Sequence, residues 1–393
     1  MSATIDVNQD GAVPTEAELV ERARALVPML RSRAEEVEKN RAVPDATIEE
    51  FKKAGFFKIV QPTHFGGWEM NPVVFYKVLM ELGRGCCSSA WNMMILGVHQ
   101  WEFGLFPRQA GDDVWAKDNT IAVSSSYAPW GTAKKVDGGY VLNGTWRTSS
   151  GCDHADWAII GARIETPGGG MDMHSFLVDG RDYTVDDDWH TFGLCGTGSR
   201  SLVVKDAFVP DYRHHSIVDY QMSDRGDMYL FPFNMIFYFA GAAVMIGFGQ
   251  GAADLYVEEM QTRQSVMSGR VLKNNPNVKD RLGNAVVKIR SARARLLEDM
   301  REATQYVSRR ELVPSDLRIR YMLDGAQAGK DVEEAALLLY KATSAKGIFL
   351  STPLQRVVRD ILAAANHPTL NVDDAASMLG DYLLNGELPP GFR

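Results

Sequence analysis

Hydroxyl, thiol, carboxylate and imidazole groups lie close together in one short segment, WRTSSGCDHADW, which begins at Trp146. Cys152, Asp153 and His154 are consecutive in it, and consecutive side chains of a strand point to opposite faces. Zinc sites use paired ligands at short regular spacing, and the sequence offers no second pair. The two preceding serines lack the Gly-x-Ser-x-Gly turn that exposes a nucleophile. The segment therefore predicts neither a metal site nor a nucleophile, and Cys152 and His154 are interpreted as structural.

Two segments rich in hydroxyl groups, SSSYAPWG (124–131) and TSSG (148–151), are accompanied by many aromatic residues. Hydroxyls and backbone amides at a sheet edge can bond ring nitrogens and carbonyls, while apolar residues cover the ring face. The combination is compatible with a pocket for a flat heteroaromatic ring, although most of the aromatic residues are expected in the core or at subunit contacts. These are Trp91, Trp101, Tyr127, Trp130, Trp146 and Trp157.

Two histidines stand in segments that leave their roles open. His99 lies in the apolar and aromatic stretch ILGVHQWEFGLF, where it is either a core histidine bonded to backbone or a functional base. His367 follows an Ala-rich helical segment and precedes a proline, where an imidazolium would also stabilise the helix dipole. The residue patterns alone favour neither alternative.

The segment GFGQGA (247–252) formally matches a dinucleotide-binding fingerprint. It lies inside a long helical pattern instead of at a strand-to-helix turn, and no acidic residue follows about 20 positions later. We therefore expect its glycines to allow two helices to approach closely, and no NAD site is predicted.

Composition and charge exclude several functional classes. The formal charge of −8 is spread over mixed signs with no basic stripe, so nucleic acid is not an expected partner. The longest apolar run, residues 235–249, is shorter than the roughly 20 residues of a spanning helix, and no signal peptide is visible. Four cysteines without a CxxC pair fit reduced thiols in the cytoplasm.

The hydrophobic period divides the chain into four parts. Residues 1–14 are polar and expected to be disordered. Helical spacing predicts a helical domain over 15–119, period-two alternation predicts an antiparallel β domain over 120–213, and helical spacing returns over 214–393. The order predicts an α+β fold. The broad apolar faces of the long helices also predict an oligomer.

Particular elements are predicted from shorter patterns. Asp45 is a plausible N-cap for a helix to residue 54, and Asp137-Gly138-Gly139 is the predicted turn of a hairpin. Helices are expected over about 18–30, 72–83, 88–105, 282–307 and 314–343, and further strands over 157–164, 174–180 and 200–210.

Several segments in the right order resemble one branch of the acyl-CoA dehydrogenase fold, over about residues 19–392. The branch is that of the oxygenase components of two-component, reduced-flavin-dependent aromatic monooxygenases. The matching motifs are GFFKIVQPTHFGG (55–67), GVHQWEFGLF (97–106), SSSYAPWG (124–131), NGTWRTSSGCDHADW (143–157), GLCGTGSRSLVVKDAFVP (193–210) and ELPPG (387–391). The resemblance implies an N-terminal helical domain, a central antiparallel β-barrel-like domain and a C-terminal four-helix bundle.

The resemblance also implies a chemistry. Reduced FMN, or FADH2 in some members, arrives from a separate NAD(P)H-dependent flavin reductase. It reacts with O2 to a C4a-hydroperoxide that hydroxylates a phenolic or indolic ring. A homotetramer is implied as well.

Site residues follow from the same resemblance. Ser150 would bond flavin N5, with Thr148 and Ser149 along the same strand edge, and Ser125 would lie near flavin and substrate. Trp91 would pack on the flavin, Arg263 would meet its phosphate, and His99 and His367 would flank the substrate. All of these are named at their positions in this sequence: Trp91, His99, Ser125, Thr148, Ser149, Ser150, Arg263 and His367.

Three alternatives and one departure accompany the resemblance. Acyl-CoA dehydrogenases often carry a catalytic glutamate shortly after an Arg-Asp pair, but here Arg359-Asp360 leads to His367. This difference argues against an FAD-dependent acyl-CoA dehydrogenase, which is kept as one alternative. The others are an oxygenase acting at sulfur or nitrogen and a non-enzymatic binding protein on the same scaffold. Relatives often have arginine where this chain has Cys195, which leaves the substrate more open than the reaction type.

Overall fold

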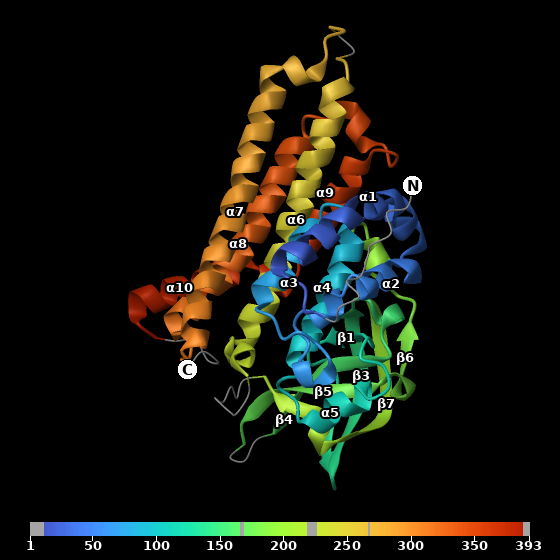
Figure 1. The fold of residues 1–393 in the computed structure, drawn as a ribbon, viewed down its shortest axis with the longest axis vertical. Helices are drawn as coiled ribbons and strands as arrows, with labels where there is room; N and C mark the ends of the chain where they lie inside the picture. The colour runs from blue at the N-terminus through green and yellow to red at the C-terminus, as the bar shows by residue number, and fades with distance from the viewer. Residues whose placement is uncertain (1–11, 166–168, 218–225, 266–267, 388–393) are drawn as a thin grey trace.

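The computed structural model describes residues 12–165, 169–217, 226–265 and 268–387. Helices at the N-terminal end pack beside two β-sheets, and long helices from the C-terminal half rise from this base (Figure 1). The layered order of helices, sheets and helices is the predicted α+β architecture. The disorder predicted for residues 1–14 falls mostly on residues 1–11, which lie outside the described residues.

The N-terminal part is helical, as its apolar spacing predicts. The first helix, α1, begins with a capping box in which Thr15 and Glu18 bond each other's backbone. The next helix was expected to be capped by Asp45, but its N-cap is Pro44, which offers no side-chain acceptor, and Asp45 is the first helical residue. The five helices are α1 (Glu16–Asn40), α2 (Asp45–Lys53), α3 (Pro72–Leu82), α4 (Cys87–Glu102) and α5 (Arg108–Trp115).

The β part consists of two four-stranded sheets. One has the order β1-β4-β5-β8 and the other β2-β3-β7-β6. The prediction of a purely antiparallel unit was wrong in one pair, because β1 and β4 are parallel. The strands are β1 (Val123–Ser126), β2 (Thr132–Val136), β3 (Gly139–Ser149), β4 (Trp157–Glu165), β5 (Met171–Asp179), β6 (Tyr183–Asp186), β7 (Arg200–Pro210) and β8 (His214–Ser216).

Alternating side chains of the first sheet serve two cores. Ala158 and Ile160 of β4 face the second sheet and pack with Trp146 of β3. Trp157 and Ile159, one residue out of phase, join the aromatic cluster beneath α5. The sheet is therefore covered by the other sheet on one face and by helices on the other, which fixes the ends of β1 and β3 beside α4.

The end of β3 is irregular at the residues that the resemblance selected. The predicted hairpin is present, with β3 starting at Gly139, so the turn itself is Asp137-Gly138. A register shift between Trp146 and Ser149 marks a bulge against β7. Within it, Thr148 has a φ of 62°, a conformation that non-glycine residues rarely adopt. Bulges re-aim side chains, and this one sends consecutive residues in different directions.

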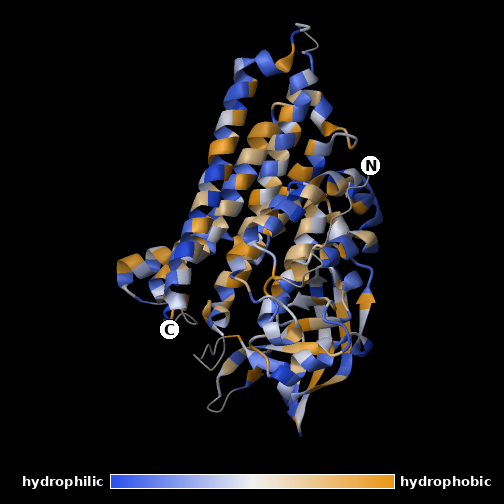
Figure 2. Ribbon diagram, viewed as in Figure 1, coloured by the Kyte–Doolittle hydropathy of each residue, from blue (hydrophilic) through white to orange (hydrophobic). Residues whose placement is uncertain are grey.

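Long helices form the C-terminal part. The central helix, α6, packs against α7, α8 and α9, as Figure 1 shows. Hydrophilic residues predominate along the outer helix α7, with hydrophobic ones interspersed (Figure 2). The helices are α6 (Phe233–Thr262), α7 (Pro276–Ser308), α8 (Ser315–Tyr340), α9 (Pro353–Ala364) and α10 (Val372–Asn385).

Helix α6 is longer than its apolar run suggested. By length and composition alone it passes as a membrane-spanning helix, but 83% of its most apolar stretch is buried inside the protein. The GFGQGA segment lies within α6, as expected. A Cβ on Gly247 would meet the Met80 carbonyl at 2.6 Å and Gly83 Cα at 3.0 Å. These contacts confirm that its glycines allow close helix approach.

Candidate functional site

A cavity of about 570 Å³ lies where α4, β1, the end of β3, the start of α6 and the segment after α9 meet. Six of the eight predicted site residues line it, although they come from distant parts of the chain. They are Trp91, His99, Ser125, Thr148, Ser150 and His367. Ser149 and Arg263 are not among the lining residues.

Three buried hydroxyl groups form one wall, here called the hydroxyl wall: Ser150, Ser199 and Thr197. The Ser150 and Ser199 Oγ atoms are 2.7 Å apart, and Ser199 Oγ is 2.6 Å from Thr197 Oγ1. The Thr197 hydroxyl donates to the Leu194 carbonyl oxygen at 2.9 Å. Thr197 belongs to the short helix η5 (Cys195–Thr197), so the GTGS segment closes over the end of β3.

Trp91 of α4 connects the hydroxyl wall to the opposite side of the cavity. Its Nε1–H donates to Ser150 Oγ at 3.2 Å. Its ring also makes an edge contact with the His367 ring, with centroids 5.4 Å apart. Trp91 is only 4% exposed, so its indole is held firmly and links the two sides of the cavity.

A second wall is built on His99 and is here called the histidine wall: His99, Glu102, Tyr127 and His215. His99 Nδ1 lies 3.2 Å from a Glu102 carboxylate oxygen, and the Tyr127 hydroxyl donates to the same oxygen. His215 of β8 bonds the other Glu102 oxygen through Nε2 at 3.0 Å. Both His99 and Glu102 are completely buried.

Glu102 is ionised in spite of its burial. Burial alone would raise the pKa of Glu102, but hydrogen bonds from His215 and His99 outweigh it and lower the pKa to about 2. His215 Nδ1 lies 2.9 Å from the Ser216 carbonyl oxygen. His215 and Glu102 therefore form a buried, hydrogen-bonded pair next to the cavity.

The ionised Glu102 determines the tautomer of His99. A carboxylate only accepts, so His99 Nδ1 carries the hydrogen. His99 Nε2 is buried and has no hydrogen-bond partner among the described residues. His99 therefore keeps a free lone pair on Nε2, and the carboxylate at its Nδ1 can stabilise the imidazolium once a proton has been taken.

His367 has the opposite arrangement. The Thr369 backbone N–H donates to His367 Nδ1 at 3.3 Å, and the Thr369 hydroxyl lies 2.8 Å from the same atom. Burial lowers the pKa of His367 to about 4, so the ring is neutral near pH 7 and its hydrogen lies on Nε2. The Nε2 atom of His367 is thus a hydrogen-bond donor, whereas the Nε2 atom of His99 is an acceptor.

The other predicted residues lie in different surroundings. Ser149 is buried at the β3 bulge, and its Oγ has no hydrogen-bond partner in the part of the chain that the structure describes. The Thr148 hydroxyl donates to the Arg147 carbonyl at 2.6 Å. Ser125 is 7% exposed and lines the cavity. Arg263 ends α6 and bonds Glu259 and the Thr343 carbonyl, so it does not reach the cavity of its own chain.

The segment that drew attention for metal or nucleophile chemistry has separate partners for each residue. Residues 152–154 form a short helix, η3 (Cys152–His154), where an alternating strand was assumed. Asp153 pairs with Arg200 and His154 with Asp45. Burial raises the pKa of the Cys152 thiol to about 12, which makes it a poor nucleophile.

Cys195 is also turned away from the chemistry. Its thiol donates to the Thr191 carbonyl at 3.0 Å, and Cys195 does not line the cavity. Cys195 itself therefore contributes nothing to the cavity wall.

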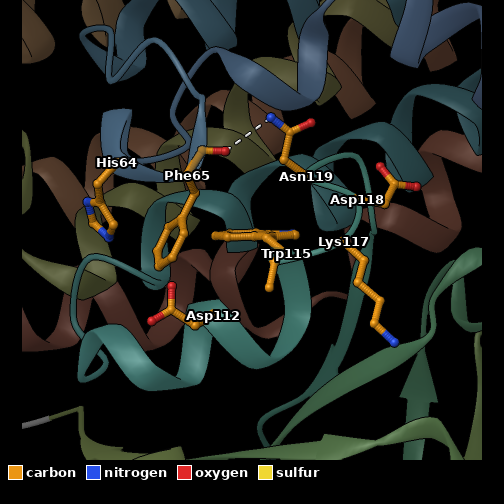
Figure 3. A pocket seen from close by; sticks show the side chains of 8 residues that line it. His64, Phe65, Asp112, Trp115, Lys117, Asp118 and Asn119 are labelled. Carbon is orange, nitrogen blue, oxygen red and sulfur yellow. Dashed lines mark hydrogen bonds between the residues drawn. The ribbon is translucent and has the colours of Figure 1, made fainter.

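A second hollow of about 470 Å³ lies near α5 (Figure 3). It contains the charged side chains of Asp112, Lys117 and Asp118, and these point in different directions around the Trp115 ring. Asn119 donates to the Phe65 carbonyl at 3.1 Å, which ties the rim together. Its groups do not converge on one point, in contrast to the histidines and serines of the first cavity.

Several residues of the site were missed by sequence reasoning. Glu102 follows His99 by three positions on a helix, a spacing that places both on one face, and it could have been found. Ser199 lies in the quoted GTGS motif but received no role. His215 and Thr369 carried no local signal, because only the fold brings them to the site.

Known proteins share the whole arrangement of this chain. Residues 14–104 match the acyl-CoA dehydrogenase N-terminal domain, and residues 239–372 match the acyl-CoA dehydrogenase C-terminal domain. The oxygenase subunit HsaA, a flavin-dependent monooxygenase of Rhodococcus jostii, is 36% identical over 371 residues, which is 92% of this chain and 97% of HsaA.

Solved structures agree with these matches. The crystal structure of 3-HSA hydroxylase from Rhodococcus sp. RHA1 has a TM-score of 0.90 and 34% identity, covering 96% of this chain and 99% of the other. XiaF from Streptomyces sp., in complex with FADH2 and glycerol, has a TM-score of 0.86 and 29% identity, covering 95% and 96%. This chain belongs to the reduced-flavin-dependent oxygenase components of two-component aromatic monooxygenases, which have the acyl-CoA dehydrogenase fold and depend on a separate reductase.

Proposed function

We propose that this oxygenase hydroxylates an uncharged phenol, which binds between His99 and His367. One observation carries the proposal: the two histidines of a single apolar cavity present opposite hydrogen-bonding roles, an acceptor at His99 Nε2 and a donor at His367. A phenolic hydroxyl needs both, because it donates its proton and its oxygen then accepts a hydrogen bond.

The cavity suits a reduced flavin ring beside the phenol. Ser150 Oγ accepts one hydrogen bond from Trp91 and keeps a further lone pair at the wall, which suits the N–H at position 5 of a reduced flavin. Trp91 offers an aromatic face, and Thr148 and Ser125 border the same space. Reduced flavin, after reaction with dioxygen, supplies the electrophilic oxygen atom.

His99 is the base of the proposed mechanism. Electrophilic oxygen transfer is faster onto a phenolate than onto a phenol, so removal of the hydroxyl proton activates the ring. His99 Nε2 accepts that proton, and Glu102 stabilises the resulting imidazolium through Nδ1. His367 donates to the phenolate oxygen and remains neutral, because its surroundings disfavour a second proton.

The lining supports an uncharged substrate. Within the described residues, the cavity wall contains no Asp, Glu, Lys or Arg side chain. A carboxylate-bearing phenol would have no cation to pair with, and burying its charge would be costly. The same composition disfavours an acyl-CoA dehydrogenase, which needs a carboxylate base inside the cavity. Apolar walls are contributed by Met94, Ile95, Val98, Leu194, Ile217, Phe233, Phe237 and Ala240.

The finer assignments of cofactor and compartment are also proposals. We propose FMNH2 as the flavin, with FADH2 as the alternative that the Streptomyces relative's complex supports. An NAD(P)H-dependent flavin reductase would supply it. Four free cysteines fit the reducing cytoplasm.

We propose a homotetramer, and the position of Arg263 supports an assembly of more than one copy. Arg263 lies 26 residues beyond Phe237 on α6, which is about 40 Å along the helix axis. It can therefore meet the phosphate of a flavin only in the cavity of another copy. Arg263→Ala should weaken flavin binding without changing the cavity of its own chain, and sedimentation analysis tests the assembly.

The experiment that tests the function follows oxygen from the gas phase into product. The protein, supplied with FMNH2 or FADH2 by a generic reductase under ¹⁸O2, is offered phenols matched in size with and without a carboxylate. We expect a mass gain of one ¹⁸O atom in the uncharged phenols, and much less in the carboxylates. Preference for the carboxylates, or no incorporation, would overturn the proposal.

A further inference from the structure

We propose that Ser199 and Thr197 are positioning residues that hold Ser150 Oγ as a hydrogen-bond acceptor, so that the site distinguishes reduced from oxidised flavin. The inference rests on the proposed placement of the flavin ring beside Ser150. It assigns a function to two residues of the GTGS segment, neither of which contacts the substrate's histidines.

The directions of the hydrogen bonds follow from counting hydrogens. A carbonyl oxygen only accepts, so the single Thr197 hydroxyl hydrogen points to Leu194 at 2.9 Å. Thr197 Oγ1 must then accept from Ser199, and Ser199 Oγ must accept from Ser150. This is the one arrangement that satisfies all three contacts.

The remaining contact of Ser150 completes the assignment. Indole N–H groups only donate, so the bond from Trp91 Nε1 occupies one lone pair of Ser150 Oγ. The Ser150 hydrogen is committed to Ser199, and one lone pair remains free at the cavity wall. Ser150 can therefore accept a further hydrogen bond there and cannot donate one.

Flavin N5 changes its character with oxidation state. In the reduced ring N5 carries a hydrogen and donates, whereas in the oxidised ring N5 has only a lone pair and accepts. A fixed acceptor at Ser150 stabilises the reduced form, and it faces the oxidised form with two opposed lone pairs. The enzyme must take up reduced flavin and release oxidised flavin in each cycle, and tighter binding of the reduced form favours both steps.

Burial keeps the hydroxyl wall in this arrangement. Ser150 is 6% exposed, Ser199 is 4% exposed and Thr197 is 1% exposed, so water does not compete for their hydrogen bonds. Without Ser199 as acceptor, the Ser150 hydroxyl would be free to rotate toward the cavity. The preference for reduced flavin is thus a property of the whole chain of hydroxyls.

The test measures dissociation constants of FMN and FMNH2, the latter under anaerobic conditions, for the full-length protein. In Ser199→Ala the freed Ser150 hydroxyl can donate to N5, so binding of oxidised FMN should tighten by about tenfold, with binding of FMNH2 changed by less than about threefold. Thr197→Val removes the acceptor of the Ser199 hydroxyl and should act in the same direction. Ser199→Thr keeps the hydroxyl and should retain the wild-type ratio.

The matched control is Ser175→Ala, which removes a buried serine hydroxyl on β5, away from the cavity lining. It should leave both dissociation constants unchanged. A gain in affinity for oxidised flavin would show that the Ser150 hydroxyl has been reoriented, because structural damage would weaken binding of both flavin forms. If wild-type protein prefers FMNH2 but both variants keep that preference, the inference is wrong. If wild-type protein binds no FMNH2, the proposed function itself fails.

Discussion

The two walls of the cavity differ in how they hold their hydrogens. The hydroxyl wall contains three neutral groups, and a backbone carbonyl at its end sets the direction of every bond. The histidine wall contains the buried, ionised Glu102, whose charge sets the tautomer of His99. One wall is insensitive to pH, whereas the other depends on ionisation.

This difference suits the two molecules that the cavity is proposed to receive. A flavin must be recognised by a hydrogen on one ring nitrogen, and neutral groups in fixed orientation do this without moving a proton. A phenol must lose a proton, which requires a titratable group with a counter-charge behind it. The two walls should therefore fail in different ways when they are altered.

The largest effect is expected for Glu102→Gln. His215 would lose the carboxylate that its Nε2 contacts, and His99 would lose the group that fixes its Nδ1–H. The free energy of unfolding should fall by about 3 kcal/mol, as for other broken buried pairs. Hydroxylation should fall at least about 100-fold, as for loss of a general base. Urea unfolding and single-turnover product formation measure the two effects.

A double variant separates the charge from the chemistry. In Glu102→Gln with His215→Gln neither member of the buried pair is left without its partner, so much of the stability should return while hydroxylation stays low. FMNH2 affinity should stay within about threefold of wild type, since the hydroxyl wall is untouched. Recovery of hydroxylation in the double variant would contradict the role of Glu102.

His99→Gln and His367→Gln should differ in their pH profiles. Without His99 the phenol keeps its proton, so hydroxylation should fall about 100-fold at pH 7 and rise toward the phenol's own pKa near 10. Loss of His367 removes a donor to the phenolate, which should cost about tenfold at every pH. Rapid-quench rates between pH 6 and pH 10 compare them, and identical profiles would argue against opposite roles.

The hydroxyl wall and the histidine wall also differ in how far sequence could predict them. Ser150 was found because its motif is contiguous, and its position at the cavity was expected from the resemblance. Ser199 was not assigned, since the direction of a hydroxyl chain becomes visible only when β3 and η5 are brought together. Thr148 and Ser149 were expected to share an edge with Ser150, but a bulge cannot be derived from these residue types.

The histidine wall and His367 depend on contacts between residues that are far apart in the sequence. His99 and His367 were singled out, but their tautomers depend on Glu102 and Thr369. His215 lies 113 positions from Glu102 and belongs to β8, a strand that hydrophobic alternation did not reveal. The helices were predicted well because their apolar period is long, whereas the parallel β1–β4 pair has no sequence signal of its own.

Stability should depend on pH through His367. The folded pKa is about 4 and the unfolded value is near 6.5, so between these values the unfolded chain binds more protons. The contribution is therefore intact above pH 6.5 and is lost as pH falls toward 4. Between pH 7 and pH 5 it should amount to about 1–2 kcal/mol. Urea titrations measure the free energy of unfolding of wild type and of His367→Asn at each pH. As pH falls, the wild-type value should drop by about this much more than that of the variant. Equal drops in the two proteins would contradict the assignment.

The smallest effect is expected at the residue that joins the walls. Trp91→Phe keeps an aromatic face but removes the N–H that donates to Ser150 at 3.2 Å. Ser150 would gain a second free lone pair while its hydrogen stays committed to Ser199, so it would remain an acceptor. FMNH2 affinity should fall only about threefold, and the preference over oxidised FMN should persist. Anaerobic titration measures both, and loss of the preference would mean that Trp91, instead of Ser199, orients the Ser150 hydroxyl.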